Sequence, residues 1–470
     1  MANNCQIPTP VEYANIMLDY INYKNDLYGK RVLENSCGEG NILIEIVKRY
    51  IIDLKSNGYS KKQIEEGLAR DIIAFEIDSK CIETCIFRLN NVTFSYHLED
   101  IQWHIENKDY LDNPIDNADY IIGNPPYITY HNLADNQREY VQKHFKTCRH
   151  GRFDYCYAFI EASLAALGMN GKMVYLIPFS IFKNKFASDL REYILPYLLE
   201  IYDYRTIQIF PKRITSSAII VCENGKEENS IFYKYVIQNT SKKIKKNQLN
   251  GKWVFNDPNV GEKKFGDFFK VSNSVATLCN EAFLLDDYTK EDQVTFVKGL
   301  PIENEVIKEA ASTKSIKMLK NHQKRSKIIF PYKIYGKEIK RYSNDEFKEC
   351  FPNATKYLEQ FKEKLDARQA DEKSSWFEYG RSQSLESVMG KKLVMPMVIT
   401  KAVTIYEIGE GSIPYAGYYI KKIAGGELSL KEAKQILESK HFYEYVKEHG
   451  TPTTAASYRI SVNDIKNYMF

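Results

Sequence analysis

Short apolar runs alternate with longer helical patterns through the first half of the chain. Residues 72–75, and residues 173–177 within the predicted strand 172–178, carry hydrophobic side chains at consecutive positions, as strands buried on both faces do. Between them, segments such as residues 42–51 repeat apolar residues at helical spacing. Strands that alternate with helices form a mainly parallel sheet with helices on both faces. The sequence therefore predicts an α/β fold with a Rossmann-like, doubly wound sheet.

One of these predicted strands ends in glycine and is followed by Asn124, Pro125, Pro126 and Tyr127. Each proline fixes its own φ and lacks an N–H, and the residue before a proline is driven toward extended geometry. The loop is therefore stiff, and it can hold the Asn124 side-chain oxygen and the Pro125 carbonyl as neighbouring acceptors beside the Tyr127 ring. Two converging acceptors suit a planar amino group such as the N6 of adenine. The alternative is an ordinary proline-rich turn.

Acids and glycines stand at the ends of the strands that precede this loop. Glu34 comes before Gly38-Glu-Gly40, Glu76 follows residues 72–75, and Asp109 follows a weaker strand. At the carboxyl ends of parallel strands, glycines let a ligand approach the backbone and acids accept hydrogen bonds from ribose. The Gly-x-Gly turn lacks the full NAD and ATP fingerprints. Glu76 could instead simply cap the helix that begins near Asp78. Together with the strand end at Asn124, however, these make four strand-end sites in one order, which favour a ligand pocket.

Composition narrows the class of protein. Hydrophobic residues make up 44% and charged residues 27% of the 470-residue chain, which are globular values. No apolar run approaches the roughly 18 residues of a membrane span, and the start of the chain lacks a signal-peptide pattern. The nine cysteines are scattered, without a zinc-type pairing. We therefore predict a soluble, cytoplasmic protein with no membrane partner and no metal site.

Charge is unevenly distributed along the chain. Residues 1–230 hold 25 Lys and Arg against 31 Asp and Glu, whereas residues 231–470 hold 40 against 30. A polar turn at residues 224–229 separates the two parts, which gives predicted domains of residues 1–228 and 229–470. Basic and aromatic residues also alternate between positions 314 and 341, a mixture that can contact the phosphates of a polyanion. A solvated basic face is the alternative reading of the same pattern.

The motifs of residues 9–222, and the order in which they follow one another, resemble those of the gamma-class amino-methyltransferases, which methylate adenine N6 in DNA. The shared features are an N-terminal Thr-Pro, an acid before Gly-x-Gly, an acid-x-Asp, a third acid, Asn-Pro-Pro-Tyr, and a Phe before an apolar strand. The family commonly has proline after the first acid, where this chain has Asn35. Residues 336–342, 376–383 and 458–460 resemble the family's specificity domain. The resemblance implies a methyltransferase domain followed by a mixed α+β target-recognition domain.

The resemblance implies that S-adenosylmethionine binds at the strand ends. Thr9 and Glu34 would lie by the methionine part of this cofactor. Glu76 would bind the ribose hydroxyls and Asp109 the adenine amino group. The complete set of implied cofactor-binding residues is Thr9, Glu34, Cys37, Gly38, Gly40, Glu76, Ile77, Asp109 and Asn124.

The resemblance also assigns the residues that would meet the target. Asn124 and Pro125 would accept hydrogen bonds from the target amino group, Tyr127 would stack on a base flipped out of the duplex, and Phe210 would contact its other side. Catalysis would rest on positioning and electrostatics, with no metal and no covalent enzyme intermediate. The implied partner is double-stranded DNA. The residues expected to contact it are Lys324, Arg325, Lys337, Arg341, Arg381 and Gln383.

Three other functions use parts of the same pattern. A protein glutamine methyltransferase and a structured-RNA adenine methyltransferase could use the same loop, because the substrate of each carries the same planar amino group. A noncatalytic DNA-binding specificity protein could use a decayed methyltransferase scaffold, but the intact site residues argue against decay. Because the cofactor motifs begin by Thr9, we expect no fused nuclease before them, and the protein would be a solitary modification enzyme or act beside a separate cognate restriction endonuclease. The sequence predicts neither the recognised bases nor the oligomeric state.

Overall fold

The computed structural model describes residues 7–211, 215–319, 326–336, 338–382, 384–454 and 456–470. The chain divides into two compact units. Unit 1 comprises Met1–Asn256 and Thr451–Ala456, and unit 2 comprises Asp257–Gly450 and Ser457–Phe470. Among the helices that the structure describes, none combines the length and the apolar character that a membrane crossing requires.

Unit 1 is built on a nine-stranded sheet. Its strands are β1 (Val32–Glu34), β2 (Ile72–Phe75), β3 (His104–Glu106), β4 (Ala118–Gly123), β5 (Leu167–Pro178), β6 (Leu198–Tyr204), β7 (Ser217–Glu223), β8 (Ser230–Tyr235) and β9 (Thr240–Lys245). They follow the spatial order β3-β2-β1-β4-β5-β7-β6-β8-β9. The strands from β3 to β5 run parallel, and β7 is antiparallel to both of its neighbours. Strand β8 runs parallel to β6, and β9 closes the edge antiparallel to β8.

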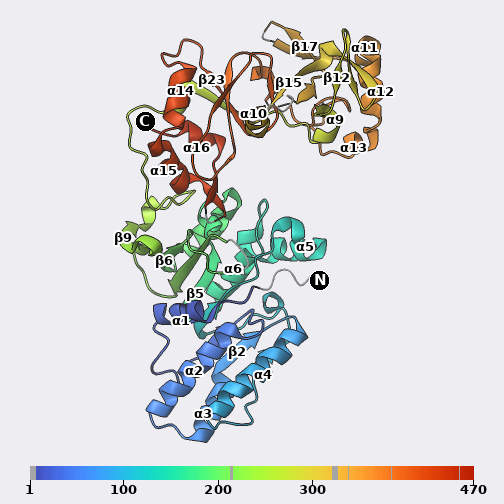
Figure 1. The fold of residues 1–470 in the computed structure, drawn as a ribbon. Coiled ribbons are helices and arrows are strands. Elements are labelled where there is room, and N and C mark those ends of the chain that lie inside the picture. The colour runs from blue at the N-terminus through green and yellow to red at the C-terminus, as the bar shows by residue number, and fades with distance from the viewer. Residues whose placement is uncertain (1–6, 212–214, 320–325, 337, 383, 455) are drawn as a thin grey trace. The chain divides into compact units, whose positions relative to one another are not determined.

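Helices cover both faces of this sheet, as the sequence predicts. They are α1 (Val11–Tyr20), α2 (Asn41–Ser56), α3 (Lys61–Asp71), α4 (Ser79–Ser95), α5 (Asp135–His144), α6 (Cys156–Ala166) and α7 (Ser188–Ile194). Successive strand residues point to opposite faces, so Val32 and Ile122 pack with α1 to α4 while Leu33 and Ile121 pack with α5 to α7. Figure 1 shows α2, α3 and α4 beside β2. The predicted doubly wound α/β fold is confirmed.

The sequence predicts a helix over residues 182–199 of unit 1, and this prediction is wrong. Residues 182–199 form the end of a 3-10 turn (Phe179–Phe182), a second 3-10 turn (Lys185–Ala187), helix α7 and the start of β6. Pro196 lacks the backbone N–H that would continue the helical hydrogen bonds, and α7 ends at Ile194. The apolar residues that follow, including Leu198 and Ile201, are fully buried in the sheet.

The sheet continues past the polar turn at residues 224–229. Strand β8 pairs with β6 on one side and with β9 on the other. Ile231, Tyr233, Ile244 and Trp253 are buried in the cluster that α5 to α7 cover. The compact unit therefore ends at Asn256, whereas the sequence predicts a boundary after residue 228. The polar turn joins two strands of one sheet.

Unit 2 combines small, mostly antiparallel sheets with short helices, in agreement with the predicted mixed α+β class (Figure 1). Its strands are β10 (Phe269–Asn273), β11 (Leu284–Leu285), β12 (Thr289–Lys290), β13 (Val294–Val297), β14 (Leu300–Glu303), β15 (Ile307–Ala311), β16 (Lys327–Ile329), β17 (Tyr332–Tyr335), β18 (Glu338–Arg341), β19 (Lys392–Met395), β20 (Val398–Ile399), β21 (Tyr406–Ile408), β22 (Ile413–Pro414), β23 (Tyr418–Lys422) and β25 (Ser457–Arg459). Strand β24 (Thr451–Thr454) is counted with unit 1.

The helices of unit 2 frame two apolar cores. They are α8 (Phe265–Phe268), α9 (Asn280–Phe283), α10 (Thr313–Leu319), α11 (Asn344–Cys350), α12 (Pro352–Glu359), α13 (Lys362–Asp366), α14 (Leu430–Leu437), α15 (Lys440–His449) and α16 (Val462–Lys466). One core includes residues of α11, α12 and β16, and the other includes residues of α14, α15 and β23. The sequence also predicts an amphipathic helix over residues 357–368, and the structure divides this segment between α12 and α13.

Candidate active site

The glycine turn after β1 has backbone geometry that suits a ligand-binding loop. Gly38 has φ +52° and Gly40 has φ +82°, both in the left-handed region that favours glycine. The Cys37 N–H donates to the Phe75 carbonyl, which fastens the turn to the end of β2. A Cβ atom on Gly40 would lie 2.5 Å from Cys85 Sγ, whereas a Cβ on Gly38 would meet nothing within 4 Å. Gly40 therefore allows close packing against α4, and Gly38 lies beside open space.

Glu76, which follows β2, accepts three hydrogen bonds from backbone N–H groups, one of them from the glycine turn. Its Oε2 accepts from the Gly38 N–H at 2.9 Å. Its Oε1 accepts from the backbone N–H groups of Ile77 and Asp78, each at 2.9 Å. The helix that follows is capped by Asp78, whose side chain accepts from the Lys80 N–H. Glu76 is therefore not the cap of α4. A carboxylate has about four acceptor sites, so one remains for a ligand hydroxyl.

Glu34, the last residue of β1, is a buried carboxyl group. It is 2% exposed. Among the described residues, its Oε2 has no hydrogen-bond partner. Burial raises the pKa of Glu34 well above its usual range, the charges of Cys85 and Glu76 raise it further, and the Leu43 N–H opposes them. Because a buried carboxylate is costly without a partner, this group favours a proton or a cationic ligand.

Cys37, Ile77 and Asp109 complete the predicted cofactor set. Cys37 is 5% exposed, and a hydrogen bond with Cys85 and burial keep the pKa of its thiol well above the usual range. Ile77 is 62% exposed at the surface beside Glu76. The Asp109 carboxylate accepts from the Leu111 N–H and from the Tyr155 hydroxyl, each at 3.0 Å. All three lie at or just after the ends of β1, β2 and β3.

The side-chain amide of Asn124 is fixed on both sides at the end of β4. Its Nδ2 donates to the Ile7 carbonyl and to Thr9 Oγ1, each at 3.2 Å. Its Oδ1 accepts from the Tyr127 hydroxyl at 2.5 Å, and that hydroxyl also lies 2.6 Å from the Leu176 carbonyl. The structure thus brings together Thr9, Asn124 and Tyr127, three residues that the sequence predicts for one site.

Phe210 stands apart from these groups. It is 1% exposed and packs in the core beneath α1 to α4. A contact with a base would require the ring to become accessible, so that contact stays a prediction.

Sequence reasoning missed a second layer of polar residues that supports the loop. Asn35 donates to Ser163 Oγ at 2.8 Å and accepts from the Tyr175 hydroxyl at 2.8 Å. The Ser36 hydroxyl donates to the Asn124 carbonyl at 3.3 Å. Asn35 occupies the position where the resembled family commonly has proline, and that departure was the one available signal. The interior partners, Ser163 and Tyr175, carry no sequence signal because helices and strands often contain such residues.

A further contact joins the N-terminal segment to the glycine turn. The Asn41 side chain, at the start of α2, donates to the Thr9 carbonyl at 2.9 Å. Arg88 on α4 donates to the Asn41 side-chain oxygen at 2.7 Å and to the Glu39 carbonyl at 2.6 Å. Thr9 is therefore held against both the glycine turn and the Asn124 loop.

The structure describes two of the six residues predicted to contact DNA. The Arg381 guanidinium forms an ion pair with Asp371 at 2.8 Å. This contact, together with hydrogen bonds from Ser382, lowers the pKa of Asp371 to about 2. Arg341 lies 3.5 Å from the Glu378 carboxylate and also donates to the Lys373 carbonyl. Both arginines are thus engaged with their own chain. The other four, Lys324, Arg325, Lys337 and Gln383, lie outside the described residues.

Unit 1 is a Rossmann-like α/β domain that carries these polar residues at the ends of its strands. Residues 41–210 match the family described as Eco57I restriction-modification methylase. The matched segment contains Glu76, Asp109 and the Asn124 loop.

Relatives extend this likeness beyond the matched segment. The chain is 22% identical over 472 residues to the type II restriction enzyme and methyltransferase RM.Eco57I of Escherichia coli, covering 81% of this chain and 47% of that protein. It is 30% identical over 229 residues to the type II methyltransferase M.AccI of Acinetobacter calcoaceticus, covering 46% and 36%. The chain thus spans about half or less of the length of these relatives.

Solved structures show the same fold along the whole chain. The type IIL restriction-modification enzyme MmeI, solved in complex with DNA, matches 97% of this chain and 64% of its own, with a TM-score of 0.61 and 13% identity. The ATP-dependent type ISP enzyme LlaBIII, solved bound to DNA, matches 100% of this chain and 38% of its own, with a TM-score of 0.52 and 11% identity. At these identities the likeness concerns the fold alone.

Proposed function

We propose that this protein is a site-specific DNA methyltransferase that transfers the methyl group of S-adenosylmethionine to the N6 of an adenine flipped out of the duplex. The observation that carries the proposal is the fixed amide of Asn124. Its nitrogen donates hydrogen bonds to the Ile7 carbonyl and to Thr9 Oγ1, so its oxygen is the atom available as an acceptor. A carbonyl oxygen has two lone pairs, and the Tyr127 hydroxyl uses one of them.

The strand ends offer the groups that this cofactor requires. S-adenosylmethionine, when bound, supplies an electrophilic methyl group on a positively charged sulfur. Glu34 has a buried carboxylate oxygen without a partner in the described structure, which suits a cationic ligand. Glu76 retains an acceptor site for ribose beside the open space at Gly38, and Asp109 would accept from the adenine amino group.

The residues of the loop would act on the target amino group by position and electrostatics. Asn124 Oδ1 and the Pro125 carbonyl would accept its two hydrogens, which raises electron density on a weakly nucleophilic nitrogen and aims its lone pair away from the loop. Tyr127 would stack on the base. Because adenine N6 is paired within a duplex, the base must leave the stack to reach these acceptors.

Unit 2 would supply DNA recognition. Residues 231–470 carry 40 basic against 30 acidic residues, which favours a polyanionic partner. MmeI, whose fold matches 97% of this chain, was solved with DNA. We place catalysis within residues 1–228, which belong to the compact unit that extends to Asn256, and target recognition in the remainder of 229–470. The biological role would be modification, in a cytoplasmic restriction-modification system with a separate cognate endonuclease or as a solitary enzyme.

A methyl-transfer assay with three acceptors tests the proposal. The purified chain and tritiated S-adenosylmethionine would be offered duplex DNA, folded RNA and protein in parallel, with Asn124→Ala as the matched control. We expect label in duplex DNA alone, and none with the variant. Label in protein would favour a glutamine methyltransferase, label in RNA an RNA adenine methyltransferase, and no label beside tight DNA binding a noncatalytic specificity protein. Each of these three results would overturn the proposal.

A further inference from the structure

The orientation of the Asn124 amide is set by acceptors on the N-terminal segment. The Ile7 carbonyl can only accept a hydrogen bond, so the Asn124 atom that faces it at 3.2 Å must be the nitrogen. The second hydrogen of that nitrogen goes to Thr9 Oγ1, also at 3.2 Å. Both donor sites of the amide group are thereby used, and the oxygen is turned toward Tyr127.

This orientation matters because the two ends of an amide have nearly the same shape and opposite hydrogen-bonding character. If the amide rotated by half a turn, it would present a donor to the target amino group, which is itself a donor. Thr9 is 3% exposed, and its carbonyl accepts from the Asn41 side chain at the glycine turn. The Thr9 hydroxyl is therefore a rigid partner, held by the same segment that borders the cofactor turn.

We propose that Thr9 is a positioning residue for methyl transfer: its hydroxyl, together with the Ile7 carbonyl, holds Asn124 with Oδ1 toward the target amino group. This inference rests on the proposed function and assigns to Thr9 a role toward the acceptor loop. It differs from the cofactor contact that the family resemblance implies. Because the Thr9 carbonyl also accepts a hydrogen bond from the Asn41 side chain, a change in the glycine turn would alter the orientation of the Asn124 amide.

Two substitutions separate the hydroxyl from the shape of the side chain. Thr9→Val has nearly the same shape without the acceptor, and Thr9→Ser keeps the acceptor. We expect Thr9→Val to lower kcat roughly five- to tenfold, as for the loss of one or two neutral hydrogen bonds, with the KM for S-adenosylmethionine within twofold of wild type. Thr9→Ser should restore kcat. Thermal unfolding of both variants would identify any general loss of structure.

A measurement without turnover gives a second readout. The Asn124 side-chain NH2 hydrogens should exchange slowly in wild type and in Thr9→Ser, and faster in Thr9→Val, when followed by NMR. The role would be wrong if Thr9→Val kept kcat, or if it raised the KM for S-adenosylmethionine while leaving kcat and exchange unchanged. If wild type methylated RNA or protein, the DNA assignment would fail, but the same comparison on that acceptor would still decide the role of Thr9.

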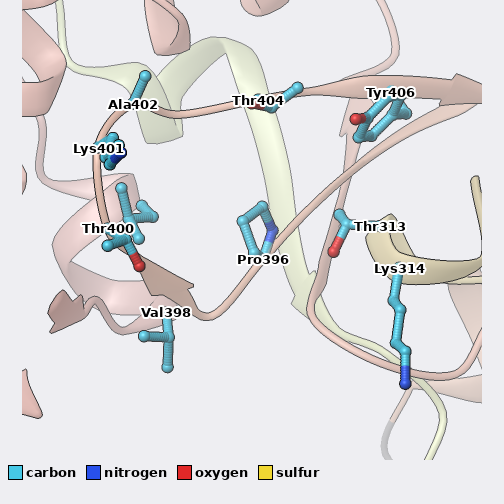
Figure 2. Close-up of a pocket in the computed structure, with 10 residues that line it drawn as sticks. Thr313, Lys314, Pro396, Val398, Thr400, Lys401, Ala402, Thr404 and Tyr406 are labelled. Atoms are coloured by element: carbon cyan, nitrogen blue, oxygen red, sulfur yellow. The ribbon is translucent and has the colours of Figure 1, made fainter. Parts of the chain in front are cut away.

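A separate observation in unit 2 concerns how DNA is held. A hollow of 660 Å³ lies between the start of α10 and residues 396–406. Figure 2 shows the side chains that line it, among them four hydroxyl residues and two lysines. The hydroxyl residues are Thr313, Thr400, Thr404 and Tyr406, and the lysines are Lys314 and Lys401. No acidic residue belongs to the lining formed by the described chain.

Six of the ten lining residues carry groups that contact nucleic-acid phosphates, namely lysine ammonium groups and Thr or Tyr hydroxyls, and the other four are apolar. Lys314 and Lys401 are exposed. By contrast, Arg341 and Arg381 line a second hollow together with Asp371 and Glu372, where acids offset their charge. We infer that the Thr313–Tyr406 hollow binds the phosphate backbone of duplex DNA, an inference that also rests on the proposed function.

Charge reversal at the hollow, with a matched control, tests this surface. The test pair is Lys314→Glu with Lys401→Glu, and the control pair is Lys348→Glu with Lys356→Glu, two exposed lysines of α11 and α12. Each neutralised phosphate contributes a slope of roughly −0.9 in log K against log salt. The test pair should therefore make the slope for duplex binding less steep by about two such units, and the control pair should leave it unchanged.

The outcomes distinguish this surface from the general charge of unit 2. Equal loss of DNA binding by both pairs, or no change in slope with the test pair, would overturn the hollow as a phosphate site. Methylation of DNA by wild type would leave the proposed function intact in either case. If wild type bound no duplex at any salt concentration, both the hollow and the DNA assignment would be wrong.

Discussion

Replacing Glu76 with Gln should weaken both the glycine turn and S-adenosylmethionine binding. Glu76 accepts from three backbone N–H groups through two oxygens. Gln has only one such oxygen. If that oxygen keeps the Ile77 and Asp78 contacts, the new amide nitrogen must face the Gly38 N–H, donor against donor.

The magnitude follows from the lost contact. A hydrogen bond to a charged group contributes about 1.5–3 kcal/mol, and Glu76 is only 7% exposed, so solvent screens it little. We expect the free energy of unfolding to fall by about 1.5–3 kcal/mol. Because the ribose acceptor loses its charge as well, the Kd for S-adenosylmethionine should rise roughly 10- to 150-fold.

Asp78→Ala is the matched control, because Asp78 caps α4 at the same strand end. Loss of an N-cap costs about 1 kcal/mol, and Asp78→Ala should leave the Kd within twofold. Urea unfolding gives the stabilities and titration calorimetry gives the affinities. If Glu76→Gln lost stability but bound S-adenosylmethionine as wild type does, Glu76 would only support the turn, and its proposed cofactor role would be refuted.

Three further predictions concern the same site. The raised pKa of Glu34 means that its proton stabilises the folded protein at low pH, and this contribution is lost as pH rises toward the folded-state pKa. A cationic cofactor should displace that proton, so the affinity for S-adenosylmethionine should rise as pH rises above the usual Glu range, by up to about tenfold per pH unit. Calorimetry in buffers of different ionisation enthalpy should detect the released proton. Glu34→Gln should abolish this proton release. Gly40→Ala should lower the free energy of unfolding, measured in urea, by at least about 1–2 kcal/mol, because residue 40 has a left-handed φ and an added Cβ would meet Cys85. A smaller decrease would contradict the described turn. Asn124→Ala should abolish methyl transfer while the Kd for S-adenosylmethionine stays within about threefold of wild type; equal loss of binding, seen by calorimetry, would show that Asn124 serves the cofactor.

The strand ends could be predicted because each carries a local signal. The run 72–75 has consecutive apolar residues and ends in an acid, and the structure places β2 at Ile72–Phe75 with Glu76 next to the glycine turn. The alternative that Glu76 caps a helix could not be decided from sequence, since Asp78 two residues later can cap as well. Only the hydrogen bonds distinguish the two acids.

Features that depend on residues far apart in the chain were not predictable. The hydrogen bond from the Asn124 side chain to Thr9 joins positions separated by 115 residues. No periodic pattern in the sequence predicts such a contact. Residues 182–199 are apolar enough for a helix, but Pro196 and the place that β6 takes between β7 and β8 decide the outcome. The polar turn near residue 228 indicates a loop, and whether a loop ends a domain depends on what the next strand pairs with.

The central claim is that the Asn124 loop directs a methyl group to adenine N6 in duplex DNA. The most direct measurement is nucleoside mass spectrometry of duplex DNA that has been incubated with the purified chain and S-adenosylmethionine and then digested completely. We predict N6-methyldeoxyadenosine, absent when the chain carries Asn124→Ala. Methylated cytosine in place of methylated adenine, or unmodified DNA beside methylated RNA or protein, would contradict it.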